Sequence, residues 1–203
     1  MSSPRGAATA ETPRPRVVIA EDEAIIRLDL KELLEEDGYD VVGETGRGDE
    51  AVELVRELRP NLVILDVMMP GLDGLSAARH IASERLAAVL VLTAFSQPDL
   101  VEQARDAGAL AYLVKPIQKS DLTPAIEVAL ARYAELTALE QSVQDLEERL
   151  ATRKLIDRAK GRLMDAHGLD EQSAWRFVQT QAMNQRVKVG EIARRVLDGD
   201  LQP

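Results

Sequence analysis

The sequence of 203 residues contains no cysteine and few aromatic or histidine residues. Because cysteine is absent, the chain forms neither a disulfide framework nor a thiolate metal site. Aromatic residues make up 3% of the chain and all hydrophobic residues 45%, so we expect an aliphatic core. The two histidines, His80 and His167, lie in no recognisable nucleophile–base motif. We therefore expect a protein that is not an enzyme.

Long apolar runs are also missing. No segment has the length of a membrane span, and the first residues lack the apolar middle of a signal peptide. We expect a cytoplasmic protein with no membrane partner. The net charge of −10 argues against attraction of the whole protein to nucleic acid, although it leaves room for a local basic face. Residues 1–14 are small, polar and rich in proline, which is typical of a disordered leader.

Short apolar runs alternate with helical patterns between residues 15 and 130. The apolar runs are residues 16–20, 41–44, 62–65, 87–92 and 111–114. The helical patterns cover residues 24–38, 49–58, 75–85 and 99–107, and a last one begins near Asp121. This alternation predicts βαβ units and a parallel sheet covered on both faces. The expected fold class is an α/β, flavodoxin-like (βα)5 domain.

Polar side chains stand where the predicted strands end. Glu21 and Asp22 follow the first strand, and Asp66 follows the run LVIL of the third. Thr93 and Lys115 occupy the same place after the fourth and fifth. In a flavodoxin-like sheet the ends of strands one and three are neighbours, so we expect these side chains to converge.

Clustered carboxylates with a nearby ammonium group suit magnesium and phosphate chemistry. Carboxylate oxygens suit Mg²⁺, which shares phosphate oxygens. Lys115 is a compact cation for a phosphoryl oxygen, and Thr93 is a hydrogen-bond donor for another. Asp66 is then the nucleophile that forms an aspartyl phosphate. The alternative is a structural ion pair between Lys115 and Asp66 that binds nothing.

Residues 16–130 resemble the receiver domain of a two-component response regulator. The matching motifs are Glu21-Asp22, LDVMMPGLDG around Asp66, LTAF with Thr93, and YLVKP with Lys115. The resemblance implies that a sensor histidine kinase phosphorylates Asp66. It also implies Mg²⁺ binding by Asp22, Asp66 and the backbone carbonyl of Met68, with help from Glu21. Glu21 departs from the pattern, since many receivers have aspartate there.

The resemblance further implies a switch and a characteristic peptide bond. Thr93 would move toward the phosphate while Tyr112 turns inward. The bond between Lys115 and Pro116 is often cis in this family, against the general preference for trans.

Residues 131–152 predict a coiled-coil linker helix. Its apolar residues step by three and four, which is an a/d heptad pattern: Leu136, Leu139, Val143, Leu146 and Leu150. The pattern fits a coiled-coil dimer seam or a helix that packs on its own chain. Of the two possible dimers, we favour one that forms on phosphorylation over a constitutive one.

The tail, residues 153–203, predicts a small all-α domain of three helices. Helical patterns cover residues 155–164, 170–183 and 189–197, and Asp170 is a suitable N-cap. The tail has ten cations and seven anions, a charge of +3, so the remainder carries −13. A basic end on an acidic body suggests a polyanionic ligand, although a solvated helical surface also explains it.

The tail resembles an ANTAR domain, a three-helix RNA-binding module. The matching positions are Ile156, Ala159-Lys160-Gly161, Leu163-Met164, Ala174-Trp175, Ala182-Met183 and Arg186. The order of receiver, linker and ANTAR domain also resembles actinobacterial antiterminator response regulators. This implies binding to RNA hairpins and transcription antitermination. We expect RNA contacts from Lys160, Arg162, Arg186 and Lys188. A DNA-binding or protein-docking helical domain is the alternative.

Overall fold

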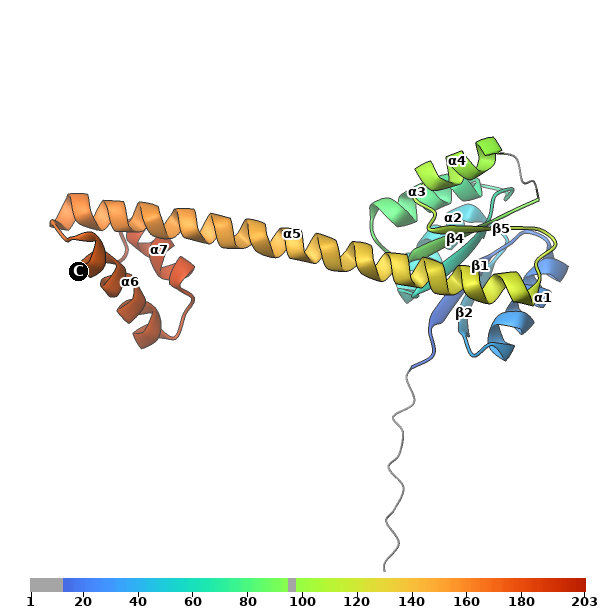
Figure 1. Cartoon of the computed structure of the whole chain (residues 1–203), viewed down its shortest axis with the longest axis horizontal. Coiled ribbons are helices and arrows are strands. Elements are labelled where there is room, and N and C mark those ends of the chain that lie inside the picture. Colours follow the sequence, from blue (N-terminus) through green and yellow to red (C-terminus); the bar gives the residue numbers. More distant parts are fainter. Residues whose placement is uncertain (1–12, 95–97) are drawn as a thin grey trace, which may run out of the picture. The chain divides into compact units, whose positions relative to one another are not determined.

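The computed structural model describes residues 13–94 and 98–203, so most of the expected leader, 1–14, lies outside the described residues. The chain divides into two compact units between Leu136 and Thr137. The first contains a β-sheet with its helices, and the second is helical (Figure 1). Within the described ranges, no helix combines the length and apolar character needed to cross a membrane.

The first unit is built on a five-stranded parallel sheet. Its strands are β1 (Arg16–Ala20), β2 (Asp40–Thr45), β3 (Leu62–Asp66), β4 (Ala88–Thr93) and β5 (Ala111–Val114). The order β2-β1-β3-β4-β5 is that of a flavodoxin-like fold, which confirms the predicted class. Strands β3 and β4 each extend far enough to include the polar residue expected after them, Asp66 and Thr93.

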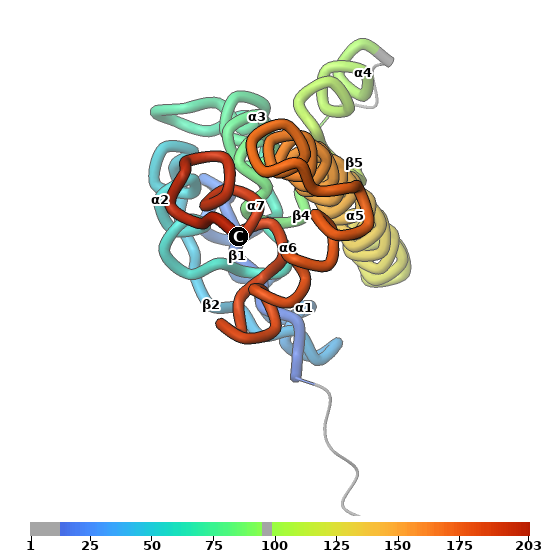
Figure 2. The backbone as a smooth tube through the Cα atoms, turned by 90° about the vertical axis from the view of Figure 1, so that its left-hand side faces the viewer, coloured from blue at the N-terminus to red at the C-terminus, as the bar shows by residue number. Residues whose placement is uncertain are grey.

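Helices cover both faces of this sheet (Figure 2). They are α1 (Ala24–Glu36), α2 (Gly48–Leu58), α3 (Gly74–Ser83), α4 (Pro98–Asp106) and the start of α5 (Lys119–His167). Alternate residues of each strand enter different cores because side chains alternate across a strand. Val18 packs with α2, α3 and α4, whereas Val17 and Ile19 pack with α1 and α5. Both cores are largely aliphatic, as predicted.

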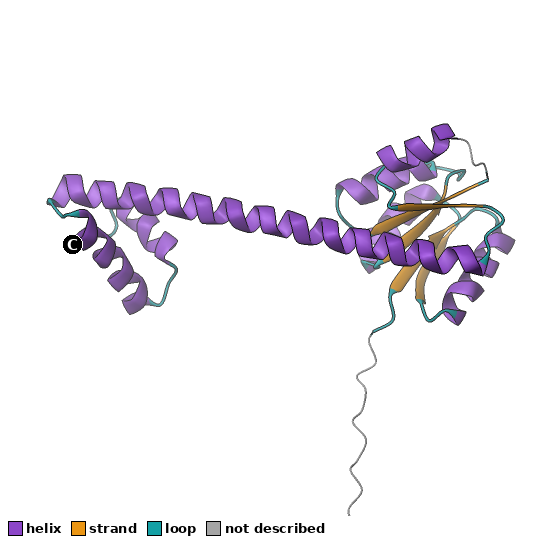
Figure 3. Cartoon of the chain, viewed as in Figure 1, coloured by secondary structure: helices purple, strands orange, loops and turns teal. Residues whose placement is uncertain are grey.

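Helix α5 runs unbroken from the last helix of the first unit through the predicted linker. It begins at Lys119, so Asp121 lies in its first turn and does not cap it. It continues to His167, so the linker helix and the first helix of the tail, predicted separately, are one element (Figure 3). The physical reason is that the only glycine after Leu122 in this stretch, Gly161, is tolerated within a helix at modest cost.

The second unit is a three-helix arrangement of the end of α5 with α6 (Glu171–Gln185) and α7 (Val189–Asp198). Asp170 caps α6, since its side chain accepts a hydrogen bond from the backbone nitrogen of Ser173 at 2.7 Å. The core of the unit consists of small and aliphatic residues: Ala159, Leu163, Ala174, Val178, Ala182, Ile192, Ala193 and Val196. The predicted small all-α domain is therefore confirmed.

Candidate phosphoryl-acceptor site

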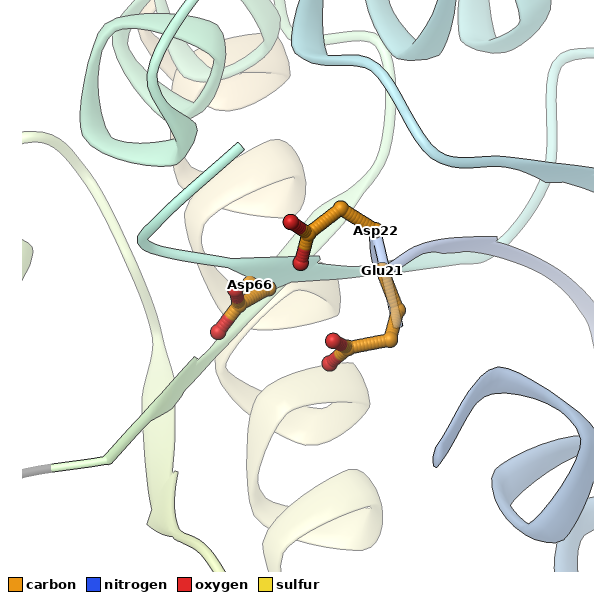
Figure 4. Close-up of side chains that lie close together, drawn as sticks. All are labelled: Glu21, Asp22 and Asp66. Carbon is orange, nitrogen blue, oxygen red and sulfur yellow. The ribbon is translucent and has the colours of Figure 1, made fainter. Parts of the chain in front are cut away.

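Three carboxylates meet at the carboxyl ends of β1 and β3. Ala20 lies opposite Leu65 in the parallel ladder, so Glu21, just after β1, and Asp66, the last residue of β3, are neighbours at this edge of the sheet. Asp22 follows on the same loop. One carboxylate oxygen from each acidic residue lies within 4.8 Å of the others (Figure 4). Glu21 and Asp66 are buried, whereas Asp22 is exposed.

Lys115 connects the two buried carboxylates. Its ammonium nitrogen lies 2.7 Å from Oε2 of Glu21 and 2.9 Å from Oδ1 of Asp66. The peptide bond that follows it, to Pro116, is cis, as the resemblance implies. The ion pair of the alternative interpretation is therefore present, but it includes a second buried acid and stands beside the exposed Asp22. A simple structural pair needs neither.

The backbone around Asp66 is held closely by the loop that follows it. The backbone nitrogen of Met68 donates a hydrogen bond to Oδ2 of Asp66 at 3.2 Å. At Gly74, where α3 begins, a Cβ atom would lie 1.8 Å from the carbonyl oxygen of Asp66. Asp73 caps α3 by accepting from the backbone nitrogen of Ser76 at 2.9 Å. Sequence reasoning missed the role of Gly74, although the glycine was visible in the motif.

Burial and the ammonium group act in opposite directions on the acids. Burial raises the pKa of the Asp66 carboxyl group, and the hydrogen bond from Lys115 opposes this rise. Burial also raises the pKa of Glu21, and the hydrogen bond from Lys115 again opposes this rise. Burial alone lowers the pKa of Lys115, but hydrogen bonds to Glu21 and Asp66 outweigh it and raise that pKa. Three carboxylates facing one ammonium group leave excess negative charge, which favours binding of a further cation.

The donors fit Mg²⁺. Carboxylate oxygens are the hard ligands this ion takes, and exposed Asp22 leaves room for the waters it retains. Glu21 is already paired with Lys115, which suits the helping role we expected for it. Met68 adjoins the cluster through its backbone, while its side chain is exposed.

The two predicted switch residues lie on neighbouring strands. Thr93 is buried at the end of β4, and its carbonyl oxygen accepts a hydrogen bond from the backbone nitrogen of Lys115 at 2.8 Å. Tyr112 lies on β5 opposite Val91 and is 46% exposed. Phe95 of the LTAF motif lies outside the described residues.

The four predicted RNA contacts differ in their surroundings. Lys160 is paired with Asp157 at 3.0 Å and with Glu171 at 2.8 Å. Arg162 donates to the carbonyl oxygen of Leu197 at 2.8 Å, near the end of α7. Arg186 and Lys188 are exposed in the turn between α6 and α7. Lys160 and Arg162 therefore make contacts within the unit, whereas Arg186 and Lys188 lie on its surface.

Lys160 also belongs to a groove that sequence reasoning did not predict. The groove has a volume of about 900 Å³ and runs along α5 and α6. Ile156 and Trp175 contribute apolar surface to it, and acids and cations both line it. The groove forms only where α6 lies beside α5, so the sequence pattern of α5 alone does not reveal it.

Comparison with known proteins gives two family matches. Residues 17–127 match the response regulator receiver domain, and residues 144–197 match the ANTAR domain. The second match begins inside the segment we predicted as linker, 131–152. Both matches agree with the resemblances found in the sequence.

Individual relatives repeat this division. The chain is 57% identical over 198 residues to the transcriptional regulatory protein PdtaR of Mycobacterium tuberculosis, covering 98% of this chain and 96% of the relative. It is 38% identical to the chemotaxis protein CheY of Thermotoga maritima, over 55% of this chain and 93% of that one. Among solved structures, the receiver domain of the putative response regulator NarL from M. tuberculosis matches with a TM-score of 0.57 at 30% identity. That match covers 59% of this chain and 98% of that one.

Proposed function

Because the chain belongs to the response regulators that join a receiver domain to an ANTAR domain, we propose that it is a phosphorylation-controlled transcription antiterminator that binds RNA hairpins. Its role is regulatory rather than enzymatic. The observation that carries the phosphorylation is the contact of Lys115 with both Asp66 and Glu21 beside Asp22. The RNA-binding output rests on the ANTAR match.

A sensor histidine kinase supplies the phosphoryl group. An oxygen of Asp66 forms a bond to phosphorus as the bond between phosphorus and the donor histidine nitrogen breaks. Lys115 then moves from two carboxylates toward a phosphoryl oxygen, and Thr93 donates to another. Asp22, Asp66 and the Met68 carbonyl, helped by Glu21, would hold Mg²⁺, which neutralises charge on the transferred group.

The response to phosphorylation passes through β4 and β5. Thr93 moves toward the phosphoryl group, and Tyr112, half exposed on the paired strand, turns inward. Phosphorylation shifts an existing equilibrium toward the form that binds RNA. Because β5 leads through Lys115 into α5, the end of the sheet and the linker helix are adjacent in the chain.

A dimer through α5 accompanies the active form. The five heptad residues from Leu136 to Leu150 are all exposed, so their seam is open to a second copy. In a parallel pair Glu135 of one copy would face Glu140 of the other, and Arg149 would face Lys154. These like-charge pairs weaken association by α5 alone. They support a dimer that needs phosphorylation.

The experiment that tests this function is selection from a pool of RNA hairpins with randomised loops. The full-length protein is presented with Mg²⁺ alone or with Mg²⁺ and beryllofluoride, a phosphoryl mimic, and the Asp66→Asn variant serves as control. We expect one hairpin family to be enriched only with the mimic and only by the protein that retains Asp66. Enrichment without the mimic would retain RNA binding and remove the switch. No enrichment in any state would favour a helical domain that docks on a protein. Displacement of the selected RNA by duplex DNA would favour a DNA-binding domain.

A further inference from the structure

One stretch of the second unit carries cations without any acid. Between Glu171 and Glu191 the sequence has no aspartate or glutamate, although the chain as a whole carries a charge of −10. The same stretch contains Arg176, Arg186 and Lys188. It covers nearly all of α6 and the turn to α7, so the local charge is opposite in sign to that of the whole protein.

The side chains of α6 divide into a buried and an exposed face. Residues follow one another at about 100° around a helix. Ala174, Val178 and Ala182 therefore share the face that is buried in the core of the unit. The opposite face groups four exposed residues, Arg176, Gln179, Thr180 and Met183, with Asn184 at its edge. We call this set of five residues the α6 outer face.

The α6 outer face combines the chemistry that single-stranded RNA requires. The amides of Gln179 and Asn184 are both donors and acceptors, as base edges require. Met183, which is 79% exposed, offers a flexible, polarizable thioether that packs against the ring of an unstacked base. Arg176 and the two cations of the following turn suit phosphate groups. No charged group of the opposite sign stands among them in the sequence.

The groove between α5 and α6 is a poorer place for a polyanion. Four acids and three cations line it, so its own charge is negative: Asp145, Glu148, Asp157, Glu171, Arg149, Arg153 and Lys160. Lys160 is held there by two acids and is only 17% exposed. Moving it to a phosphate would leave both acids without their partner. The charges of the unit thus direct RNA away from the groove.

We propose that the α6 outer face, with Arg186 and Lys188, binds the unpaired loop of an RNA hairpin. This rests on the proposed function and specifies the surface that performs it. The two turn cations bind phosphates, and Gln179, Met183 and Asn184 contact bases. Lys160 and Arg162, which sequence reasoning placed at the RNA, instead hold α5 against α6 and α7.

The test uses full-length protein with Mg²⁺ and beryllofluoride, and as probe a hairpin selected from the randomised-loop pool by the unmodified protein. Arg186→Gly is the most informative variant. Arg186 has a left-handed backbone with φ of 55°, a conformation that glycine adopts without cost, so the variant retains its fold. Lys188→Gln and Gln179→Ala complete the set. Arg158→Gln removes an exposed cation of α5 that lies outside the heptad seam and is the matched control.

We expect Arg186→Gly and Lys188→Gln each to weaken binding about tenfold and to lower the slope of log affinity against log salt by about 0.7–0.9. The melting temperature of Arg186→Gly should not fall. Gln179→Ala should change which loop sequences are preferred, and Arg158→Gln should bind as the unmodified protein does.

Three results overturn the proposal, and they are distinguishable. If the unmodified protein binds the hairpin and the three variants bind equally well, the α6 outer face is not the RNA surface, while the proposed function stands. If the pool yields no hairpin for the unmodified protein, the proposed function fails and the surface with it. If Arg158→Gln loses more affinity than Lys188→Gln, the RNA lies on α5 and not on the α6 outer face.

Discussion

At the scale of single residues, Lys115 decides the electrostatics of the site. Glu21 and Asp66 are both buried, and both contact the same ammonium group at 2.9 Å or less. Burying a carboxylate is costly unless it has a partner. One lysine therefore offsets part of the cost of burying two acids.

We predict that Lys115→Gln destabilises the first unit by about 3 kcal/mol at neutral pH in EDTA, because it leaves buried carboxylates without their cation. Without Lys115 the pKa values of both acids rise further above their unfolded values. The folded state then binds more protons, and its stability falls as pH rises through the raised pKa values. The loss should be smaller at pH 5 than at pH 7.5 in urea unfolding.

Lys119→Gln is the matched control for this prediction. Lys119 also contacts two acids, Glu36 and Asp37, but its side chain is 48% exposed. Exposed ion pairs contribute little to stability. An equal loss in both variants, or a loss in Lys115→Gln that does not depend on pH, would contradict the assigned role of Lys115.

At the scale of elements, the start of α3 fixes the position of Asp66. Gly74 has no room for a Cβ, because that atom would overlap the carbonyl group of Asp66. Gly161 is different, since a Cβ there, near the end of α5, meets nothing within 4 Å. Two glycines inside helices thus have opposite structural roles.

We predict that Gly74→Ala destabilises the first unit by about 3 kcal/mol and weakens beryllofluoride binding, because the added atom displaces the backbone of Asp66. Gly161→Ala should instead stabilise the second unit by about 1 kcal/mol, because alanine is the better helix former. Urea unfolding measures the stability of both variants. ¹⁹F NMR of bound beryllofluoride measures its binding to Gly74→Ala. Normal fluoride signals in Gly74→Ala would show that the close contact does not position the acceptor.

At the scale of the whole molecule, the exposed heptad residues of α5 form a surface through which two copies of the chain could associate. Apolar residues at heptad positions remain exposed from Leu136 to Leu150, where the first unit ends and the second begins. In a parallel pair of α5 helices, Glu135 of one copy and Glu140 of the other would repel each other beside these apolar residues. The balance between apolar contact and repulsion sets whether two copies associate.

We predict that Leu146→Lys prevents the dimer formed with beryllofluoride without unfolding the chain, because Leu146 is 58% exposed. Glu135→Lys should have the opposite effect and promote a dimer without the mimic, because it converts a repulsive pair into an attractive one. Sedimentation equilibrium at low salt measures both. A dimer of unchanged affinity in Leu146→Lys would exclude the seam as the contact.

Periodicity and strand-end position were enough to predict the sheet, the acidic cluster and the helical tail. Apolar runs are local in the chain, and the strand order of this fold brings the ends of β1 and β3 together. The family resemblances extended that prediction to the phosphoryl acceptor and the RNA-binding unit. These features belong to the sequence because each depends on neighbours along the chain or on a known motif.

Tertiary structure alone decided which charged groups are already engaged. Sequence placed Lys160 and Arg162 at the RNA, but Lys160 is paired with Glu171 and Arg162 with the Leu197 carbonyl. The tertiary structure also places Lys115 between two acids and Gly74 against the Asp66 carbonyl group. Such contacts join residues far apart in the chain. Their formation depends on distances of a few ångströms, which the pattern of residue types does not contain.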